Sequence, residues 1–246
     1  MRKKNAYIFC TLLAILLVSG CGNSKNAVEQ QPDITTVDRE KIAYVSYGMS
    51  EYTTGYSDLA SMAEASDLII YGEIENIDYV MEENGYCVSN LDVNVIQTIK
   101  GDVQEGDIVK VSEEQGMVTI QDYLDSYADD GMRDEMRKGY TEYSDDQLDD
   151  YYIVKLGQGD IMAEKGQKSI YLLQKSAFYD TENTYCRITG AAGSYTEVTG
   201  GGFTNTQTVG NILTAKDDMN VTLLSNDENS PFPTQTLDEL IAEMNL

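Results

Sequence analysis

The chain has 246 residues, of which 41% are hydrophobic, so it can bury a core as one ordinary domain or two small ones. Acids outnumber bases by 42 to 17, and the net charge of −25 excludes nucleic acid as a direct partner, because its phosphate backbone would be repelled. The chain has no histidine, which removes Ser-His-Asp and Cys-His catalysis and every histidine-ligated metal site.

The first 20 residues have the pattern of an export signal. Three bases at residues 2–4 precede an apolar run over residues 6–18, which is shorter than the about 20 apolar residues of a membrane span. The tetrad Val18-Ser19-Gly20-Cys21 resembles the lipobox of bacterial lipoproteins, in which a peptidase cuts before a lipidated cysteine. The resemblance implies acyl chains such as palmitate on Cys21 and an anchor on the extracytoplasmic face of the cell membrane. An ordinary secretory signal or a retained helix are the alternatives.

Residues 21–41 are predicted to be the lipidated cysteine and a flexible tether, because this stretch is polar with few apolar residues. Without the signal, the mature chain has 14 bases and 42 acids, a net charge of −28. Anionic headgroups would repel such a body. The lipid on Cys21 is therefore the expected link to the membrane.

Residues 42–246 are predicted to form one domain, with an insertion at about residues 116–150. A short helix is expected at residues 58–65 with Ser57 as its cap, followed by a strand at residues 68–77 and a turn at residues 83–85. Apolar alternation or β-branched runs predict the other strands at residues 90–95, 108–111, 151–154, 169–173, 184–188, 195–198 and 221–224.

This spacing of short strands favours a mainly β (α+β) fold, an OB-like antiparallel β-barrel. Gly200-Gly201-Gly202 is interpreted as a turn between strands, since no P-loop lysine follows it. A capping box at residues 236–239 predicts a C-terminal amphipathic helix. We expect this helix to cover an open barrel end or a sheet edge, and docking to a partner is the alternative.

The insertion is strongly acidic and rich in tyrosine. Residues 121–150 hold eleven acids and three bases, and six tyrosines lie between Tyr123 and Tyr152. We predict a helical or partly mobile segment, because β-branched residues are almost absent from it. We also predict that it binds a partner, because tyrosine offers contact area at small entropic cost and acids speed encounter with a basic partner. The residues expected to contact that partner are Tyr123, Tyr127, Asp129, Asp130, Tyr140 and Tyr143.

Calcium binding by the insertion is a weaker hypothesis, and no metal or cofactor site is predicted. Asp125, Asp129, Asp130 and Asp134 offer oxygen ligands close together in the sequence. Aligning Gly131 with the glycine of an EF-hand, however, places Arg137 where a bidentate acid is needed.

Cys87 and Cys186 are the two cysteines of the predicted folded domain. Outside the cytoplasm they could form a disulfide, and closing a loop of about 100 residues would contribute up to roughly 4.7 kcal/mol. Two buried thiols are the alternative.

Four segments carry a second resemblance: SDLIIYGEI, LDVNVIQTIKGDVQEGDIVKV, KGQKSIYLL and ITGAAGSY. They resemble uncharacterised Gram-positive lipoproteins whose domain is similar to the OB-type barrel of tissue inhibitors of metalloproteinases and netrin modules. The resemblance covers about residues 57–198 and implies the architecture alone. Inhibition by the animal proteins requires a free N-terminal cysteine amine to ligate zinc, whereas the amine of Cys21 would lie at the membrane.

These observations predict a non-enzymatic cell-envelope lipoprotein that presents an acidic, tyrosine-rich surface to an extracellular protein or glycan. No histidine and no recognisable catalytic motif are present. The alternative is a carbohydrate-binding or carboxylate-dependent carbohydrate-processing lipoprotein, because glycoside hydrolysis needs only two suitably spaced acids.

Overall fold

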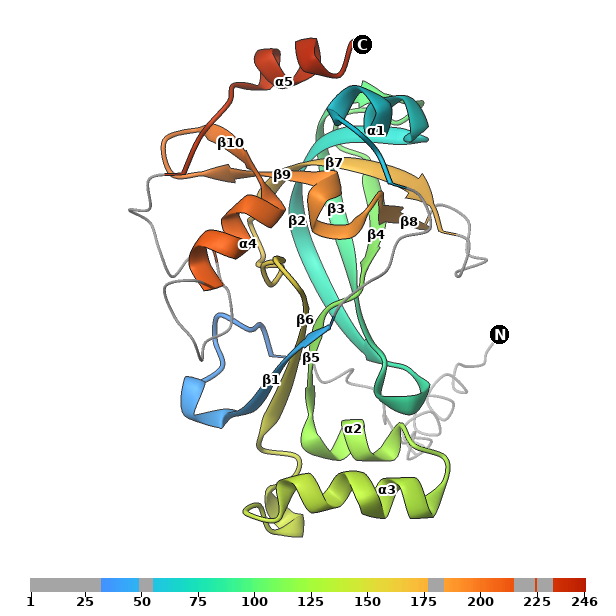
Figure 1. Ribbon diagram of the computed structural model, residues 1–246, viewed down its shortest axis with the longest axis vertical. Coiled ribbons are helices and arrows are strands. Elements are labelled where there is room, and N and C mark those ends of the chain that lie inside the picture. Colours follow the sequence, from blue (N-terminus) through green and yellow to red (C-terminus); the bar gives the residue numbers. More distant parts are fainter. Residues whose placement is uncertain (1–31, 49–54, 177–183, 215–223, 225–231) are drawn as a thin grey trace, which may run out of the picture. The chain divides into compact units, whose positions relative to one another are not determined.

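A computed structural model (Figure 1) describes residues 32–48, 55–176, 184–214, 224 and 232–246. Cys21, the predicted signal peptide and most of the predicted strand at residues 221–224 lie outside the described residues. The strands are β1 (Ile42–Gly48), β2 (Leu68–Met81), β3 (Cys87–Lys100), β4 (Ile108–Glu113), β5 (Gly116–Thr119), β6 (Tyr152–Gly157), β7 (Lys168–Lys175), β8 (Thr184–Arg187), β9 (Ser194–Val198) and β10 (Gly202–Asn205). The helices are α1 (Leu59–Ala65), α2 (Ile120–Asp125), α3 (Asp130–Arg137), α4 (Thr206–Thr214) and α5 (Leu237–Glu243), with short 3-10 helices η1 (Arg39–Lys41), η2 (Glu83–Gly85), η3 (Lys138–Tyr140), η4 (Asp145–Gln147) and η5 (Gly190–Gly193).

Five strands close into the predicted OB-like barrel. β2 pairs with β3 and β7, β3 pairs with β4, and β8 closes the ring by pairing with both β4 and β7. The β4–β8 pairing is parallel, from Lys110 opposite Thr184 to Ser112 opposite Cys186. The other pairs of the ring are antiparallel, and one parallel pair is required because a closed ring with an odd number of strands cannot be antiparallel throughout. The OB-like class itself is confirmed.

Strand alternation divides the apolar start of β2 between two cores. Leu68 and Ile70 point into the barrel, where they join buried side chains of β3 and β4. Ile69 points outward and packs with residues of β7 and of helices α1 and α5. Because both faces are covered, this strand begins with a continuous apolar run instead of an alternating one.

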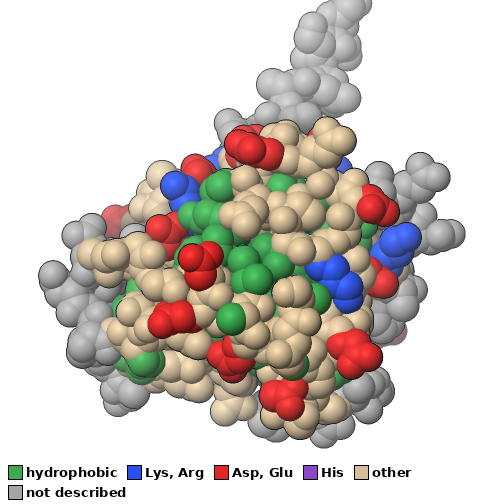
Figure 2. All heavy atoms as spheres, turned by 90° about the horizontal axis from the view of Figure 1, so that it is seen from above, with side chains coloured by type: hydrophobic (Ala, Val, Ile, Leu, Met, Phe, Trp, Pro, Cys, Tyr) green, Lys and Arg blue, Asp and Glu red, His purple; other side chains and the backbone are tan. Residues whose placement is uncertain are grey.

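Helices α1 and α5 cover the outer face of the barrel beside the edge strand β10. Leu240 of α5 is fully buried in that second core, and Phe203 of β10 bridges to Gln235 just before α5. The predicted capping box is present at Thr236, whereas the cap of α1 is Asp58 and not Ser57 as predicted. Figure 2 looks onto this face and shows hydrophobic side chains near its middle, with acids spread around them.

The insertion extends beyond the predicted residues 116–150 and occupies the chain between β4 and β7, where it contributes β5 and β6 to a second, three-stranded sheet in the order β1-β6-β5. Between β5 and β6, the predicted helical segment is present as α2, α3, η3 and η4, and we call residues 120–150 the helical lobe. β1 follows directly after the predicted tether and pairs in parallel with β6. β1 and β5 were not predicted.

The predicted tether is too long at its C-terminal end. Ile34 is 2% exposed and belongs to the barrel core, and Val37 packs against the same cluster. Because an apolar side chain gains free energy when it leaves water, Ile34 fixes the chain well before residue 41.

Candidate functional site

The tyrosines predicted to bind a partner pack against one another inside the helical lobe. The Tyr127 hydroxyl donates to the Tyr123 hydroxyl at 2.9 Å, and the ring of Tyr140 lies 6.1 Å from that of Tyr123. The Tyr143 and Tyr151 rings are 4.5 Å apart. Burial is the main cause that raises the pKa of Tyr123 and of Tyr140, the latter to about 12, so both hydroxyls stay neutral. The four tyrosines predicted to bind are half-buried, so their rings contact one another or Tyr151 and still leave part of their surface exposed.

Two lysines of the chain lie over tyrosine rings of this cluster. The ammonium of Lys155 is 4.9 Å from the ring centre of Tyr123, and that of Lys41 is 4.4 Å from the ring centre of Tyr151. Cations within about 6 Å of an aromatic face are attracted to it. These contacts link η1 and β6 to the lobe.

The tip of the β2–β3 hairpin is fastened to the end of α2. Gly85 N donates to Ser126 Oγ at 2.9 Å, Asn84 N donates to Ser126 O at 3.1 Å, and Lys155 Nζ donates to Gly85 O at 2.5 Å. Gly85 has a φ of 75°, and a Cβ there would lie 2.6 Å from a ring carbon of Tyr123. Only glycine allows this close approach to the tyrosine cluster.

Folding separates the charges of the lobe, because its two arginines are half-buried against backbone carbonyl oxygens whereas its acids are exposed. Arg133 donates to the carbonyl oxygen of Tyr127 at 2.8 Å, and Arg137 donates to those of Tyr140 and Tyr143 at 2.5 and 2.7 Å. The third base, Lys138, pairs with Glu135. The acids paired with the arginines, Asp130 and Asp145, have side chains that are 92% and 93% exposed. The solvent therefore meets mainly the negative charges.

Asp129 and Asp130 are exposed as predicted, but both also serve the fold. Asp129 Oδ1 accepts from Met132 N at 2.8 Å and caps α3. Asp130 pairs with Arg133 at 3.3 Å. Substituting either residue would change the helix as well as the surface.

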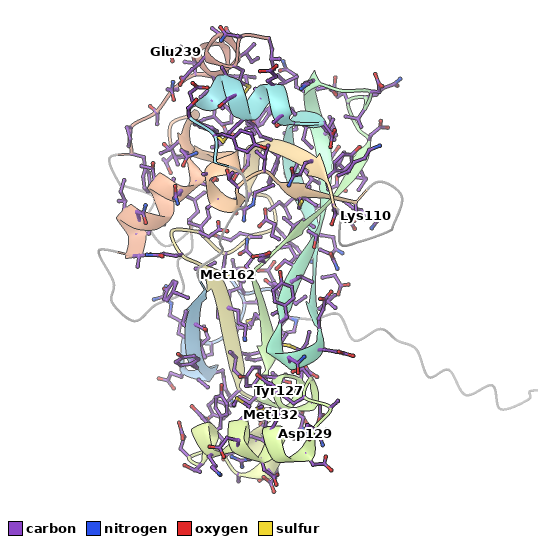
Figure 3. The ribbon with its side chains drawn as sticks, turned by 45° about the vertical axis from the view of Figure 1, so that its right-hand side comes forward. Lys110, Tyr127, Asp129, Met132, Met162 and Glu239 are labelled. Carbon is purple, nitrogen blue, oxygen red and sulfur yellow. The ribbon has the colours of Figure 1, made fainter. Side chains whose placement is uncertain are left out.

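Two large apolar side chains are exposed, one on the lobe and one on the neighbouring strand β1. Met132 of α3 is 47% exposed and lies near Tyr127 and Asp129, as Figure 3 shows. Tyr44 of β1 is 54% exposed and pairs in register with Ile153, which packs in the core of the lobe. Sequence reasoning missed Tyr44 because it lies in a segment far from the insertion, and no local pattern links the two.

Cys87 and Cys186 are free thiols, so the structure has the alternative of two separate thiols and not the possible disulfide. Cys186 pairs with Ser112, which pairs with Asn90, and Cys87 lies three residues before Asn90 on β3. Two strand spacings and three residues along a strand separate the Cα atoms by roughly 14 Å, whereas a disulfide needs less than about 7 Å. Burial raises the pKa of Cys87 to about 12, which keeps the thiol protonated.

A second cluster of charges lies at the barrel wall, fully buried. Arg187 Nε donates to Glu113 Oε1 at 2.9 Å, and Arg187 Nη2 donates to Asp160 Oδ2 at 2.5 Å. Arg187 also donates to Ser194 Oγ at 3.2 Å, which begins a chain of buried hydroxyls continued by Thr206, Thr196 and Ser169. All three charged side chains are at most 7% exposed, so a sugar could not reach this pair of carboxylates.

Within the described ranges, no three Cys, Asp or Glu residues come close enough together to hold a metal ion. In the same part of the chain, no helix is long and apolar enough to cross a bilayer. Comparison with known protein families and with curated proteins finds no match for this chain. The exposed surface of the lobe combines acids with the exposed Met132, an arrangement that suits a positively charged partner.

Proposed function

We propose that the protein is a non-enzymatic lipoprotein of the cell envelope, and that the outer face of its helical lobe binds a basic partner outside the cytoplasmic membrane. The observation that carries the proposal is the sorting of charge in the lobe. The lobe has a net charge of −8, all eleven of its acids are exposed, and its two arginines are half-buried against backbone carbonyl oxygens. Such a field raises the rate of encounter with a partner of opposite charge.

The binding test uses exposed acids of the lobe whose side chains form no hydrogen bond or ion pair with the other described residues. Asp134, Glu142 and Asp149 are exposed on the lobe, and changing them to Asn, Gln and Asn removes three charges. The matched control changes Glu75, Asp78 and Glu105 on the barrel to Gln, Asn and Gln, which alters the net charge equally. We expect the lobe variant to lose capture of a basic envelope protein and the barrel variant to keep it. Equal capture by both would contradict a lobe site.

The membrane anchor is supported by the lipobox pattern that ends at Cys21. The predicted tether then precedes Ile34, the first residue seen in the barrel core. Metabolic labelling with an alkyne fatty acid should tag the wild type and fail to tag a Cys21→Ala variant. A Cys21→Ala protein that still labelled would contradict the anchor.

Exposure of Tyr44 favours one alternative, carbohydrate binding, because a tyrosine ring can stack on the apolar face of a sugar. A glycan array would separate the two functions. A signal that a Tyr44→Ala variant loses, and that the lobe-charge variant retains, would favour the glycan. Carbohydrate processing gains no such support, since the paired carboxylates at Arg187 are buried.

A further inference from the structure

The buried charge cluster stands where the insertion leaves the barrel and returns to it. Glu113 ends β4, Asp160 follows β6, and Arg187 ends β8 and contacts both. One guanidinium faces two carboxylates, so the fully ionised cluster would hold a net charge of −1 inside the protein. We propose that this cluster retains a proton at neutral pH, and that loss of the proton in alkaline solution weakens the attachment of the insertion to the barrel.

Hydrogen bonding indicates which carboxyl group holds the proton. Asp160 accepts three hydrogen bonds, from Arg187 Nη1 at 3.1 Å, Arg187 Nη2 at 2.5 Å and Ile161 N at 2.9 Å. Glu113 accepts two, from Arg187 Nε at 2.9 Å and from the Gln115 amide. Since each donor stabilises the charged form, Glu113 is the less stabilised anion.

The surroundings of Glu113 supply little further positive charge. Among the described residues, the charged groups that act on it are Arg187 on β8 and Asp160, with the neutral amide of Gln115 beside them. Burial raises the pKa of Glu113 although Arg187 opposes the shift, and Asp160 adds to the rise. On β7, Tyr171 is fully buried beside the cluster, and the charge of Glu113 adds to the effect of burial in raising the pKa of its hydroxyl.

The cluster is bonded to both ends of the insertion. Gln115, two residues after Glu113, accepts from Ala163 N at 3.2 Å through its side chain and from Ser89 Oγ at 2.7 Å through its backbone carbonyl. Ile161 N is bonded to Asp160. A change of charge at Glu113 therefore alters the surroundings of the Ile161 and Ala163 amides, which lie between β6 and β7.

The sign of the pH dependence follows from the raised pKa. The ordinary pKa of glutamate is about 4.3, and a higher pKa in the folded state adds stability to the fold. This stability is fully present below about pH 4.3, and it is lost as the pH rises through the raised pKa of the folded state. Over that window, the folding equilibrium constant falls by up to about tenfold for each pH unit.

The first experiment compares the wild type with Glu113→Gln and, as a matched control, Glu114→Gln, since Glu114 is the exposed neighbour. Folding constants are measured at about pH 5 and about pH 9, which bracket the titration window. Between these two pH values, the folding constants of the wild type and of Glu114→Gln should fall by a factor at least about ten times larger than that of Glu113→Gln. Equal losses in all three proteins would overturn the proposal. The absolute stability of Glu113→Gln is not the readout. Its new amide NH₂ group would face either Arg187 Nε or the Gln115 amide, both of which are hydrogen-bond donors.

The second experiment needs no variant that must fold. The side-chain carboxyl carbon of Glu113 is followed by NMR in the wild type, together with the amide resonances of Ile161 and Ala163. We expect a Glu113 midpoint well above about 4.3, with both amides moving at the same midpoint. A midpoint at or below the ordinary value would refute the retained proton, and amides that do not move would refute its coupling to the insertion.

Discussion

Replacing Gly85 with alanine tests whether the tyrosines of the helical lobe serve packing. The substitution places a methyl group 2.6 Å from Tyr123 Cε2 and 2.7 Å from the Tyr127 hydroxyl oxygen, both far below van der Waals contact. Overpacking of this kind costs about 1–3 kcal/mol. The left-handed φ of 75° adds about 1–2 kcal/mol for a residue with a Cβ. The expected loss is about 2–5 kcal/mol of the free energy of unfolding.

Gly106 provides the matched control for the backbone term. It also has a positive φ, of 87°, but a Cβ there would meet nothing within 4 Å. Gly106→Ala should therefore lose only about 1–2 kcal/mol. The difference between the two variants measures the packing of the hairpin tip against Tyr123 and Tyr127.

Thermal and denaturant unfolding followed by circular dichroism measure both losses. For a chain of this size, each kcal/mol lowers the melting temperature by about 2–4 °C. Equal losses for Gly85→Ala and Gly106→Ala would refute the close packing. The tyrosine rings would then be free to contact a partner directly.

Three other changes follow from the same structure. Arg187→Met leaves two buried carboxylates without their counter-charge and should cost about 3–5 kcal/mol in denaturant unfolding, so a loss under about 1 kcal/mol would contradict the buried cluster. Ile34→Ala should cost about 2–5 kcal/mol, whereas an unchanged stability would restore Ile34 to the tether. In a thiol titration of the folded protein, Cys87 should stay unreactive until the chain unfolds, and rapid modification of the native protein would contradict its burial.

Much of the barrel could be predicted because its strands are local patterns. The alternation at residues 90–95 and the apolar run at residues 68–70 lie in β3 and β2, and the capping box at Thr236 begins α5. β1 and β5 were not predicted from the sequence. β1 continues directly from a polar segment, and β5 is a short stretch beside the acidic insertion. The parallel pair that closes the barrel follows from the odd number of strands in the ring. The sequence of a single strand does not contain this number.

The site was less predictable, because composition does not give the direction of a side chain. Tyrosines and acids are interleaved in the insertion, yet the rings and both arginines are half-buried while the acids are exposed. The spacing of Tyr123 and Tyr127, four residues apart, was a usable signal of contact along a helical turn. The buried cluster had no such signal, since Glu113, Asp160 and Arg187 are far apart in sequence and 42 acids offer too many pairings.

Photo-cross-linking in intact cells tests the proposed binding surface most directly. A photoreactive phenylalanine analogue would replace the exposed Tyr44 of β1 or the exposed Met132 of α3, and Lys110 on the barrel strand β4 would serve as the control position. Figure 3 labels Met132 and Lys110. We expect one basic envelope protein to cross-link to the analogue at position 44 and at position 132, but not at position 110. The yield of this cross-linked product should fall as the salt concentration is raised. Cross-linking of that protein from position 110 alone, or to an equal extent from all three positions, would contradict recognition by the helical lobe.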